Sequence, residues 1–320
     1  MSLLRLLLTL LLLAVTNVTF AAFPEKPIKI IVGFPPGGPL DTHARLLIDQ
    51  LQKSLGQPVI VDYKPGAGGT IGADFVSKSP ADGYTLLMAN TGTMVINPFI
   101  YTNNIYQTLR DFTPVARTAQ QPLALVINND VPAKNFAEFV AYAKKNPGKV
   151  NYGSAGNGGI SHLVPEMLQD AAGIQLVHVP YKGSAPAFTD LLGGQVQFMA
   201  ESIPQVTQYL KAGKVRAIAM TGKERNAAIA DVPTMAESGV KNFEVVGFYG
   251  VLAPAKLPAD VLAKLNEAFR TALANDDIRS RMTQQGADPA YMDSASFAEF
   301  LKVESVRWKA AVVKAGVKLD

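Results

Sequence analysis

The sequence predicts an α/β protein with two domains, each built from a mostly parallel sheet flanked by helices. Short apolar strands alternate with amphipathic helices almost throughout, and the pattern starts again at about residue 123. Glycine-rich turns follow several of these strands. No low-complexity linker separates the halves, so we expect strands that cross between domains in place of a flexible tether.

The first 21 residues have the features of a secretory signal. Arg5 is the only charge before Glu25, residues 6–15 are almost entirely apolar, and Thr19 and Ala21 place small residues near a cleavage point. The apolar run is shorter than the roughly 20 residues that a membrane helix needs. The sequence therefore predicts a signal peptide over residues 1–21, cleavage after Ala21 or one residue later, and a periplasmic protein.

The rest of the chain is long enough for two ordinary domains. We expect domain 1 to comprise residues 22–122 and 222–320, and domain 2 to comprise residues 123–221. A first crossing is predicted near residues 115–126, and the return within 218–248.

Composition excludes several classes of protein. The net charge of +4 is spread without a basic cluster, which argues against nucleic-acid binding. The chain has no cysteine, and its histidines, His43, His162 and His178, have no metal-ligand spacing. We therefore expect neither a metal nor a cofactor.

In the first half, strands are predicted at residues 27–33, 58–63 and 83–90. A helix between the first two has one apolar face and ends at Gly56; that face consists of Ala44, Leu47, Ile48, Leu51 and Leu55. A second helix is predicted over residues 69–78. Strands separated by helices favour right-handed βαβ units.

In the second half, strands are predicted at residues 123–129, 150–154, 175–180, 196–200 and 215–220. Asn135 and Glu138 form a capping-box pattern at the start of a helix. Beyond residue 258 the chain is mainly helical, with Pro258 suited to a first helical turn. Trp308 belongs to the apolar face of a long final helix and is interpreted as a core residue.

The loop over residues 34–45 is the first candidate for ligand contact. Gly37 and Gly38 allow the backbone to approach a ligand closely, and Phe34 and Pro36 flank them. Asp41 has two interpretations: it caps the following helix and pairs with Arg45 four residues on, or it orients a ligand or a bound water.

Two further loops follow strands. Residues 64–72 are glycine-rich, but Ile71 breaks the dinucleotide fingerprint, and Pro39 stands where a P-loop at residues 33–38 would need lysine. A structural turn is the favoured interpretation of 64–72. In residues 89–98, Asn90, Thr91 and Thr93 offer hydrogen-bond donors, although turn formation explains them equally well.

The loop over residues 152–162 is the strongest candidate. Ser154, Ala155, Gly156 and Asn157 lie between a strand and a helix, where a hydroxyl and successive amides can surround an oxygen. Helix N-termini at the carboxyl ends of strands are anion sites. Two such loops, one in each half, predict that the protein closes on a small organic anion such as a carboxylate.

Catalytic signals are weak. The nucleophile-elbow pattern around a serine is absent, and so is the zinc-protease motif. His178 lies within an apolar strand and is interpreted as a core histidine. A secreted hydrolase that uses Ser154 or Ser161 remains the enzymatic alternative and is disfavoured.

The loops and several other blocks resemble the Bug family, also called TctC, the extracytoplasmic receptors of tripartite tricarboxylate transporters. The blocks that carry the resemblance are PPGGPLDTHAR (35–45), KPGAGG (64–69), ADGYTLL (81–87), RDFTPVA (110–116), NYGSAGNGG (151–159), HVPYKGSAPAFTDLLGGQV (178–196) and VPTMAESG (232–239). They extend over essentially the whole mature chain.

The resemblance implies a type II periplasmic-binding-protein fold, a Venus flytrap with the ligand in the cleft between domains. It assigns Gly37, Gly38 and Asp41 to one side of the ligand and residues 154–156 to the other. The implied ligands are small organic acids, aliphatic or aromatic, with one or more carboxylates. The implied partners are the permease subunits of a tripartite transporter, with a membrane sensor kinase as the alternative, and the expected state is a monomer.

Four departures from the family pattern bear on the ligand. Gly159 stands where a serine is usual, Pro165 is expected to interrupt the following helix, and residues 248–249 replace a common tryptophan. Glu201 stands where aspartate or asparagine is more usual. It is interpreted either as a helix cap, which is preferred, or as a group that recognises an ammonium or a protonated group.

Overall fold

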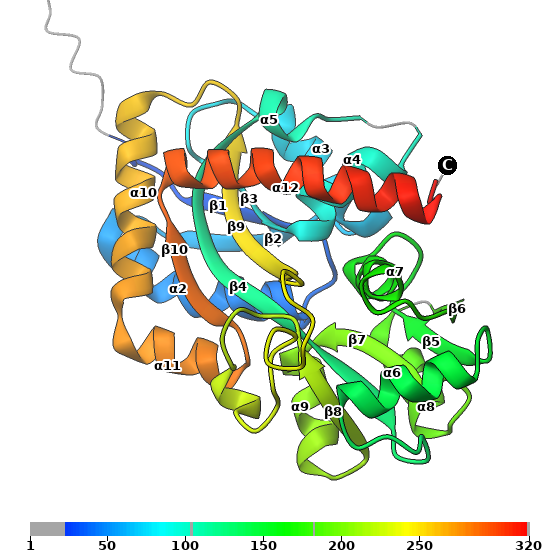
Figure 1. Ribbon diagram of the computed structural model, residues 1–320. Coiled ribbons are helices and arrows are strands. Elements are labelled where there is room, and N and C mark those ends of the chain that lie inside the picture. The colour runs from blue at the N-terminus through cyan, green and yellow to red at the C-terminus, as the bar shows by residue number, and fades with distance from the viewer. Residues whose placement is uncertain (1–22, 103–104, 182, 319–320) are drawn as a thin grey trace, which may run out of the picture.

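The computed structural model describes residues 23–102, 105–181 and 183–318, which form two α/β lobes (Figure 1). The predicted signal peptide at residues 1–21 lies outside the described residues. Lobe 1 contains strands β1 (Ile28–Val32), β2 (Val59–Tyr63), β3 (Thr85–Asn90), β9 (Val246–Pro254) and β10 (Asp288–Met292). Lobe 2 contains β5 (Val150–Ser154), β6 (Leu176–Pro180), β7 (Phe198–Ser202) and β8 (Val215–Met220).

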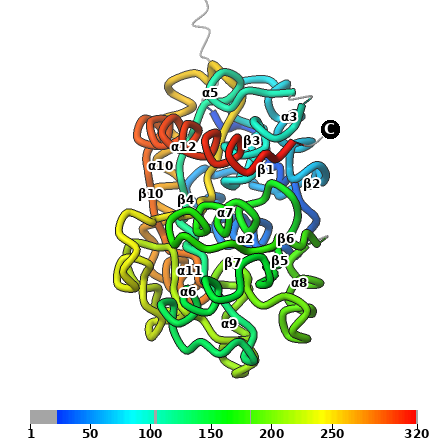
Figure 2. The backbone as a smooth tube through the Cα atoms, turned by 45° about the vertical axis from the view of Figure 1, so that its right-hand side comes forward, coloured from blue at the N-terminus to red at the C-terminus, as the bar shows by residue number. Residues whose placement is uncertain are grey.

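Helices cover both lobes. Lobe 1 carries α2 (Pro39–Leu55), α3 (Thr70–Ser77), α4 (Asn97–Ile100), α5 (Thr108–Asp111), α10 (Ala259–Ala274), α11 (Asp276–Gln284) and α12 (Ser294–Ala315). Lobe 2 carries α6 (Phe136–Lys145), α7 (Ile160–Ala172), α8 (Ser184–Leu192) and α9 (Ile203–Lys211). Figure 2 shows the lobes one above the other, with α7 of lobe 2 just below α12 of lobe 1, which it contacts.

A single long strand, β4 (Phe112–Asn128), joins the two lobes. Its first part, up to Pro122, pairs with β9 and β10, and its second part, from Leu123, pairs with β7 and β8. The chain returns to lobe 1 between β8 and β9. Because the connection is a continuous hydrogen-bonded strand, it holds the facing edges of the two lobes at one junction.

The α/β architecture predicted from the sequence is confirmed, and each sheet is mixed. The outer strands pair in parallel, β2 with β1, β1 with β3, β7 with β5 and β5 with β6. The strands around the crossing pair antiparallel. The antiparallel pairs are those of β4 with β7, β8, β9 and β10 and that of β3 with β9; the sequence analysis predicts no strand at β9 or β10. β9 contains Gly247 and Gly250, and the five residues of β10 are half-buried and include Pro289.

The predicted strands and helices of the first half lie within two residues of the observed ones. Two local expectations are wrong. Pro165 does not interrupt its helix, because α7 runs from Ile160 to Ala172 with the proline inside it. Pro258 is the residue before α10 and so lies outside the first turn.

The core explains the apolar patterns. One cluster lies under α2 and α10 in lobe 1, one lies under α8 and α9 in lobe 2, and the largest extends across both lobes beneath α7 and α12. Trp308 is fully buried in the largest cluster, and its indole N–H donates to Glu304 at 2.8 Å. Its interpretation as a core residue is confirmed.

Among the residues that the structure describes, none of the helices has the length and apolar character required to cross a bilayer.

The predicted N-cap at α6 is present, with Glu138 bonded to the amide one residue before the cap, and it supports a stability test. The Asn135 side chain accepts the amide of Glu138 at 2.9 Å, and the Glu138 carboxylate accepts the amide of Lys134 at 2.7 Å. Replacing Asn135 by alanine removes a cap worth about 1 kcal/mol. We expect chemical denaturation to show this loss with an unchanged slope, whereas Lys134→Ala, which keeps both bonds, should leave stability unaltered. Equal stability of the two variants would contradict the cap.

Candidate ligand-binding site

A cavity of about 740 Å³ lies between the lobes. Lobe 1 lines it with the turn before α2 and with residues near the ends of β3 and β9; lobe 2 lines it with the turn before α7 and with the starts of α8 and α9. The lining residues are Phe34, Pro35, Pro36, Gly37, Gly38, Pro39, Leu40, Gly68, Asn90, Gly92, Asn97, Ile100, Tyr101, Gln121, Ala155, Gly156, Asn157, Gly159, Ile160, Ser161, Gly183, Ser184, Glu201, Ser202, Gln205 and Tyr249.

Four helices, α2, α7, α8 and α9, begin at this cavity. Their N-cap residues, Gly38, Gly159, Gly183 and Ser202, all line it, and none makes a side-chain cap hydrogen bond. Among the helices that begin elsewhere, α6, α11 and α12 are each capped by an asparagine or aspartate side chain, whereas α3, α5 and α10 have no side-chain cap. The first amides of a helix have no carbonyl partner within it, so the cavity wall carries amide hydrogens and the positive ends of four helix dipoles.

The turn before α2 is held in shape by Asp41. Gly37 has a φ of +84°, and its amide donates to Asp41 Oδ2 at 2.7 Å. Asp41 Oδ1 accepts from Arg45 Nε at 2.9 Å and from the Tyr63 hydroxyl at 2.8 Å. Burial raises the pKa of Asp41, but these three donors outweigh it and hold the pKa below its ordinary value.

One interpretation of Asp41 is that it caps α2 and pairs with Arg45. The pairing with Arg45 is observed, but Asp41 is not the N-cap. Gly38 is the N-cap of α2, and Asp41 is the third helical residue, buried behind the turn. The carboxylate is therefore occupied by protein donors and does not line the cavity.

The turn before α7 has internal hydrogen bonds of the same kind. The amide of Gly158, where φ is +74°, donates to His162 Nδ1 at 3.0 Å, and the amide of Ala155 donates to Ser161 Oγ at 3.0 Å. These amides are used within the turn. The amides of Ile160 and Ser161, at the first helical positions, have no carbonyl partner within the helix and so remain available.

Ser154 does not line the cavity. Its side chain is fully buried, and its Oγ lies 2.6 Å from Nε2 of His178. Within the described part of the chain, the His178 ring contacts Ser154, His162 and Tyr152, and none of these is a carboxylate, so the serine–histidine pair does not form a triad there.

In the loop after β3, one predicted contact residue lines the cavity and two are buried behind it. Asn90 lines the cavity and accepts the Thr93 amide and hydroxyl, each at 3.0 Å. Thr93 also donates to the carbonyl of Gly68, and the Thr91 hydroxyl accepts the amide of Phe248 at 2.8 Å. Both threonines are buried and hydrogen-bond within the turn. Of the two roles considered in the sequence analysis, turn formation is the one that fits them.

Glu201 lines the cavity from β7 although only 5% of its surface is exposed. It accepts the Ser184 hydroxyl at 2.5 Å and the Ser202 amide at 2.8 Å. The preferred interpretation of Glu201 as a helix cap is wrong, because the N-cap of α9 is Ser202, the next residue. Burial raises the pKa of Glu201, and the two hydrogen bonds oppose that rise.

The cavity therefore brings together nine of the thirteen predicted contact residues: Phe34, Pro36, Gly37, Gly38, Asn90, Ala155, Gly156, Asn157 and Glu201. It leaves Asp41, Thr91, Thr93 and Ser154 behind its wall. The sequence analysis did not select Gln121, Tyr249, Ser161, Gly183 or Ser184. The glycine–serine pair 183–184 was visible in the HVPYKGS block, whereas Gln121 lies in the middle of a strand and carries no local signal.

Among the lining residues within 23–102, 105–181 and 183–318, none is a lysine or an arginine. Within the described residues, no group of three histidine, aspartate or glutamate side chains is placed to hold a metal ion. In this part of the wall, positive character is supplied by backbone amides and helix dipoles.

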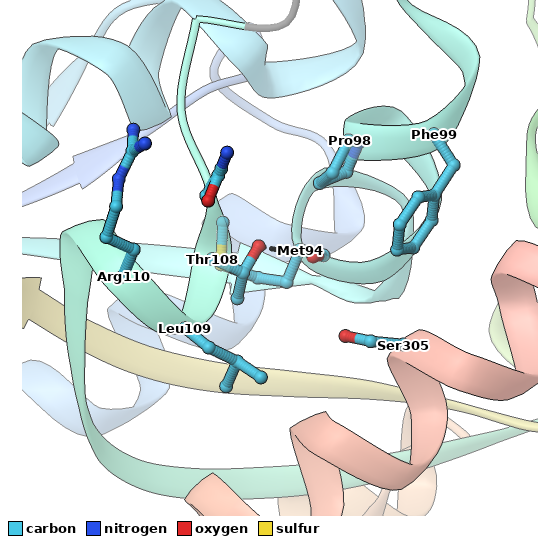
Figure 3. A pocket seen from close by; sticks show the side chains of 8 residues that line it. Met94, Pro98, Phe99, Thr108, Leu109, Arg110 and Ser305 are labelled. Atoms are coloured by element: carbon cyan, nitrogen blue, oxygen red, sulfur yellow. Dashed lines mark hydrogen bonds between the residues drawn. The ribbon is translucent and has the colours of Figure 1, made fainter.

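A second cavity, of about 480 Å³, lies outside this site against α4, α5 and α12 (Figure 3). Met94, Phe99 and Leu109 contribute its apolar wall. The Thr108 hydroxyl in that wall donates to the carbonyl of Met94, and Arg110 pairs with Asp111. Its wall is mainly apolar and no described helix of eight or more residues begins at it, so it offers no comparable set of helix-start amides.

Comparison with known proteins gives the family. Residues 43–317 match the family described as the tripartite tricarboxylate transporter family receptor, TctC. The chain is 39% identical over 294 residues to a UPF0065 protein encoded between tcbD and tcbE in Pseudomonas sp. strain P51, covering 92% of this chain and 87% of that protein. It is 36% identical to the protein BugT of Bordetella pertussis, covering 93% of this chain and 91% of BugT.

Solved structures agree with this. The periplasmic binding protein BugD has a TM-score of 0.79 and 37% identity, covering 92% of this chain and 99% of BugD. A Rhodopseudomonas palustris protein with adipate has a TM-score of 0.82 and 31% identity, covering 92% of this chain and 99% of that one. MatC from the same organism, with bound malate, has a TM-score of 0.77 and 33% identity, covering 91% and 100%. The chain belongs to the TctC family, the tripartite tricarboxylate transporter receptors, which are solute-binding proteins and not enzymes.

Proposed function

We propose that the protein binds a small organic carboxylate in the cavity between its lobes. The observation that carries the proposal is the convergence of four helix N-termini, without side-chain caps, on one cavity. Each helix start offers about half a positive charge, so four together are comparable to the two negative charges of a dicarboxylate. The adipate and malate bound by two relatives have this chemistry.

The contacts expected are mainly hydrogen bonds from backbone amides. One carboxylate would receive the free amides at the starts of α2 and α7, which come from opposite lobes. Each hydrogen bond to a charged oxygen contributes about 1.5–3 kcal/mol, so four or five, less the cost of ordering, reach the roughly 8 kcal/mol of a micromolar site. The side chains of Gln121 and Tyr249 line the cavity and offer polar groups to the rest of the ligand.

We further propose that the protein is exported to the periplasm, binds its ligand as a monomer and delivers it to the permease subunits of a tripartite transporter. Support comes from the predicted signal peptide and from family membership. Closure around a ligand would give the permease one form to recognise, since a ligand that contacts both lobes favours the closed state.

A screen of organic acids tests the binding proposal directly. Aliphatic and aromatic acids with one to three carboxylates should raise the melting temperature if they bind, because a ligand at 100 times its Kd stabilises the folded state by about 2.7 kcal/mol. Matched amides and alcohols, which lack the charge, should not. A protein stabilised by the neutral compounds and by none of the acids would contradict an anion site.

Gly38→Val tests the position of the site. Gly38 has a φ of −76°, which any residue adopts, and a Cβ there would meet only the carbonyl of Pro35 at 3.6 Å. The valine side chain should therefore spare the fold but crowd the amides at the start of α2. We expect calorimetry to show affinity at least about tenfold weaker. Gly193→Val, at the C-terminal end of α8 and outside the cavity, is the control and should bind normally.

Glu201→Gln tests the charge of the ligand next to β7. For a plain dicarboxylate, removal of a buried carboxyl from the lining removes like-charge repulsion, so affinity should rise a few-fold at neutral pH. Glutamine keeps an acceptor for the Ser184 hydroxyl. A fall in affinity would instead indicate that the ligand presents an ammonium or another donor to Glu201.

Deletion of the coding sequence tests delivery. Uptake of the acid identified in the screen should fall, and the gene should restore it. If uptake is unchanged while transcription that depends on the same acid is lost, the protein serves a membrane sensor kinase and the transport proposal is wrong.

A further inference from the structure

The turns before α2 and α7 have the same backbone shape although they come from opposite lobes. Gly37 and Gly158, which precede the N-caps, have φ of +84° and +74°. The N-caps themselves, Gly38 and Gly159, have φ, ψ of −76°, 170° and −71°, 166°. Each turn therefore leads into its helix with the same backbone shape, although the first free helical amide is that of Leu40 in α2, which begins at Pro39, and that of Ile160 in α7.

In both helices, the side chain of the third helical residue hydrogen-bonds to the preceding turn. The third helical residue is Asp41 in α2 and His162 in α7, and each accepts the amide of the glycine before the N-cap, at 2.7 and 3.0 Å. Because Gly158 N–H is the donor, His162 Nδ1 carries no proton in this arrangement. His162 is then neutral with its proton on Nε2.

His162 is itself held by a stack of rings. Its imidazole is parallel to that of His178, with 3.8 Å between centroids and an interplanar angle of 7°, and Tyr152 stacks on His178 at 4.8 Å. His178 Nε2 lies 2.6 Å from Ser154 Oγ, which also contacts the amide and carbonyl of Gly156. The ring stack thus contacts the turn at Ser154 and at Gly158.

We propose that His162, fixed by its stack on His178, is a positioning residue that orients the turn before α7 for anion binding, as Asp41 does for the turn before α2. The proposal rests on the carboxylate site proposed above. It assigns neither ring to direct ligand contact, since neither lines the cavity.

The charges around the stack favour neutral rings. Burial, with the neighbouring His162, lowers the pKa of His178 to about 4; burial also lowers the pKa of His162, opposed by Glu166. The other titratable groups nearby are Tyr152, whose hydroxyl donates to Glu166 at 2.5 Å, and Asp170 further along α7, which pairs with Lys314 of α12. A proton on His162 Nδ1 would face the Gly158 N–H, donor against donor, and would open the turn.

The pH dependence follows from these shifts. Both rings have pKa values below the ordinary 6.5, so the unfolded chain takes up protons first as pH falls. The stability that neutral rings provide is complete above about pH 6.5 and decreases toward pH 4. Affinity for a fully ionised carboxylate should accordingly be constant between about pH 8 and pH 6, with no step at 6.5.

Two replacements of His162 separate its hydrogen bond from its stacking. His162→Phe keeps a ring on His178 but has no acceptor, whereas His162→Asn places an acceptor near the position of Nδ1 and loses the ring. With adipate and malate as probes in calorimetry, we expect His162→Phe to weaken binding about tenfold and His162→Asn to stay within about threefold of the unaltered protein. Equal affinity of the phenylalanine variant and the unaltered protein, or equal loss in both variants, would overturn the proposal.

Two measurements do not need a ligand. Nitrogen-15 NMR of the unaltered protein should show His162 as the Nε2–H tautomer at neutral pH, and the Gly158 amide should exchange faster in His162→Phe than in His162→Asn. A proton on Nδ1, or equal exchange, would contradict the positioning role even if His162→Phe proved unstable. If the unaltered protein binds no acid in the screen but these results hold, the carboxylate site is wrong and the role of His162 in shaping the turn stands.

Discussion

Amide hydrogens at the beginnings of helices are the feature on which the site depends. A helix leaves its first amides unpaired, and the protein must cap them or offer them to something else. Helices α6, α11 and α12 receive asparagine or aspartate caps, and several other helices have none, but only α2, α7, α8 and α9 among the described helices of eight or more residues have an N-cap glycine or serine that lines the cavity. The cavity is therefore a place where four incomplete helix ends meet, which suits an anionic guest.

The crossing strand decides that these helix ends meet. β4 pairs with lobe 1 strands up to Pro122 and with lobe 2 strands from Leu123, so Gln121 lies at the floor of the cavity where the partners change. Parallel strands in each lobe end toward this junction, and the helices that follow them begin there. The site is thus a consequence of one strand shared by two sheets.

Apart from Glu201, the acidic groups described near the site do not face an anion directly. Asp41 is close to the first turn, but Arg45, Tyr63 and the Gly37 amide use both of its oxygens. The corresponding residue in the other lobe is a buried neutral histidine. Glu201 is the exception, a carboxyl in the wall itself, and its raised pKa reduces the repulsion that a full charge would cause.

The sequence by itself determined the α/β class, most strands and helices of the first half and the two glycine turns, because apolar periodicity and glycine are local signals. It placed Ser154 and Asp41 among the ligand contacts from position alone. Only the tertiary structure decided that Ser154 turns to His178, that Asp41 turns to Arg45 and Tyr63, and that Gln121 and Tyr249 reach the cavity. The direction of a side chain depends on partners that are distant in sequence, and no pattern along one chain specifies those partners.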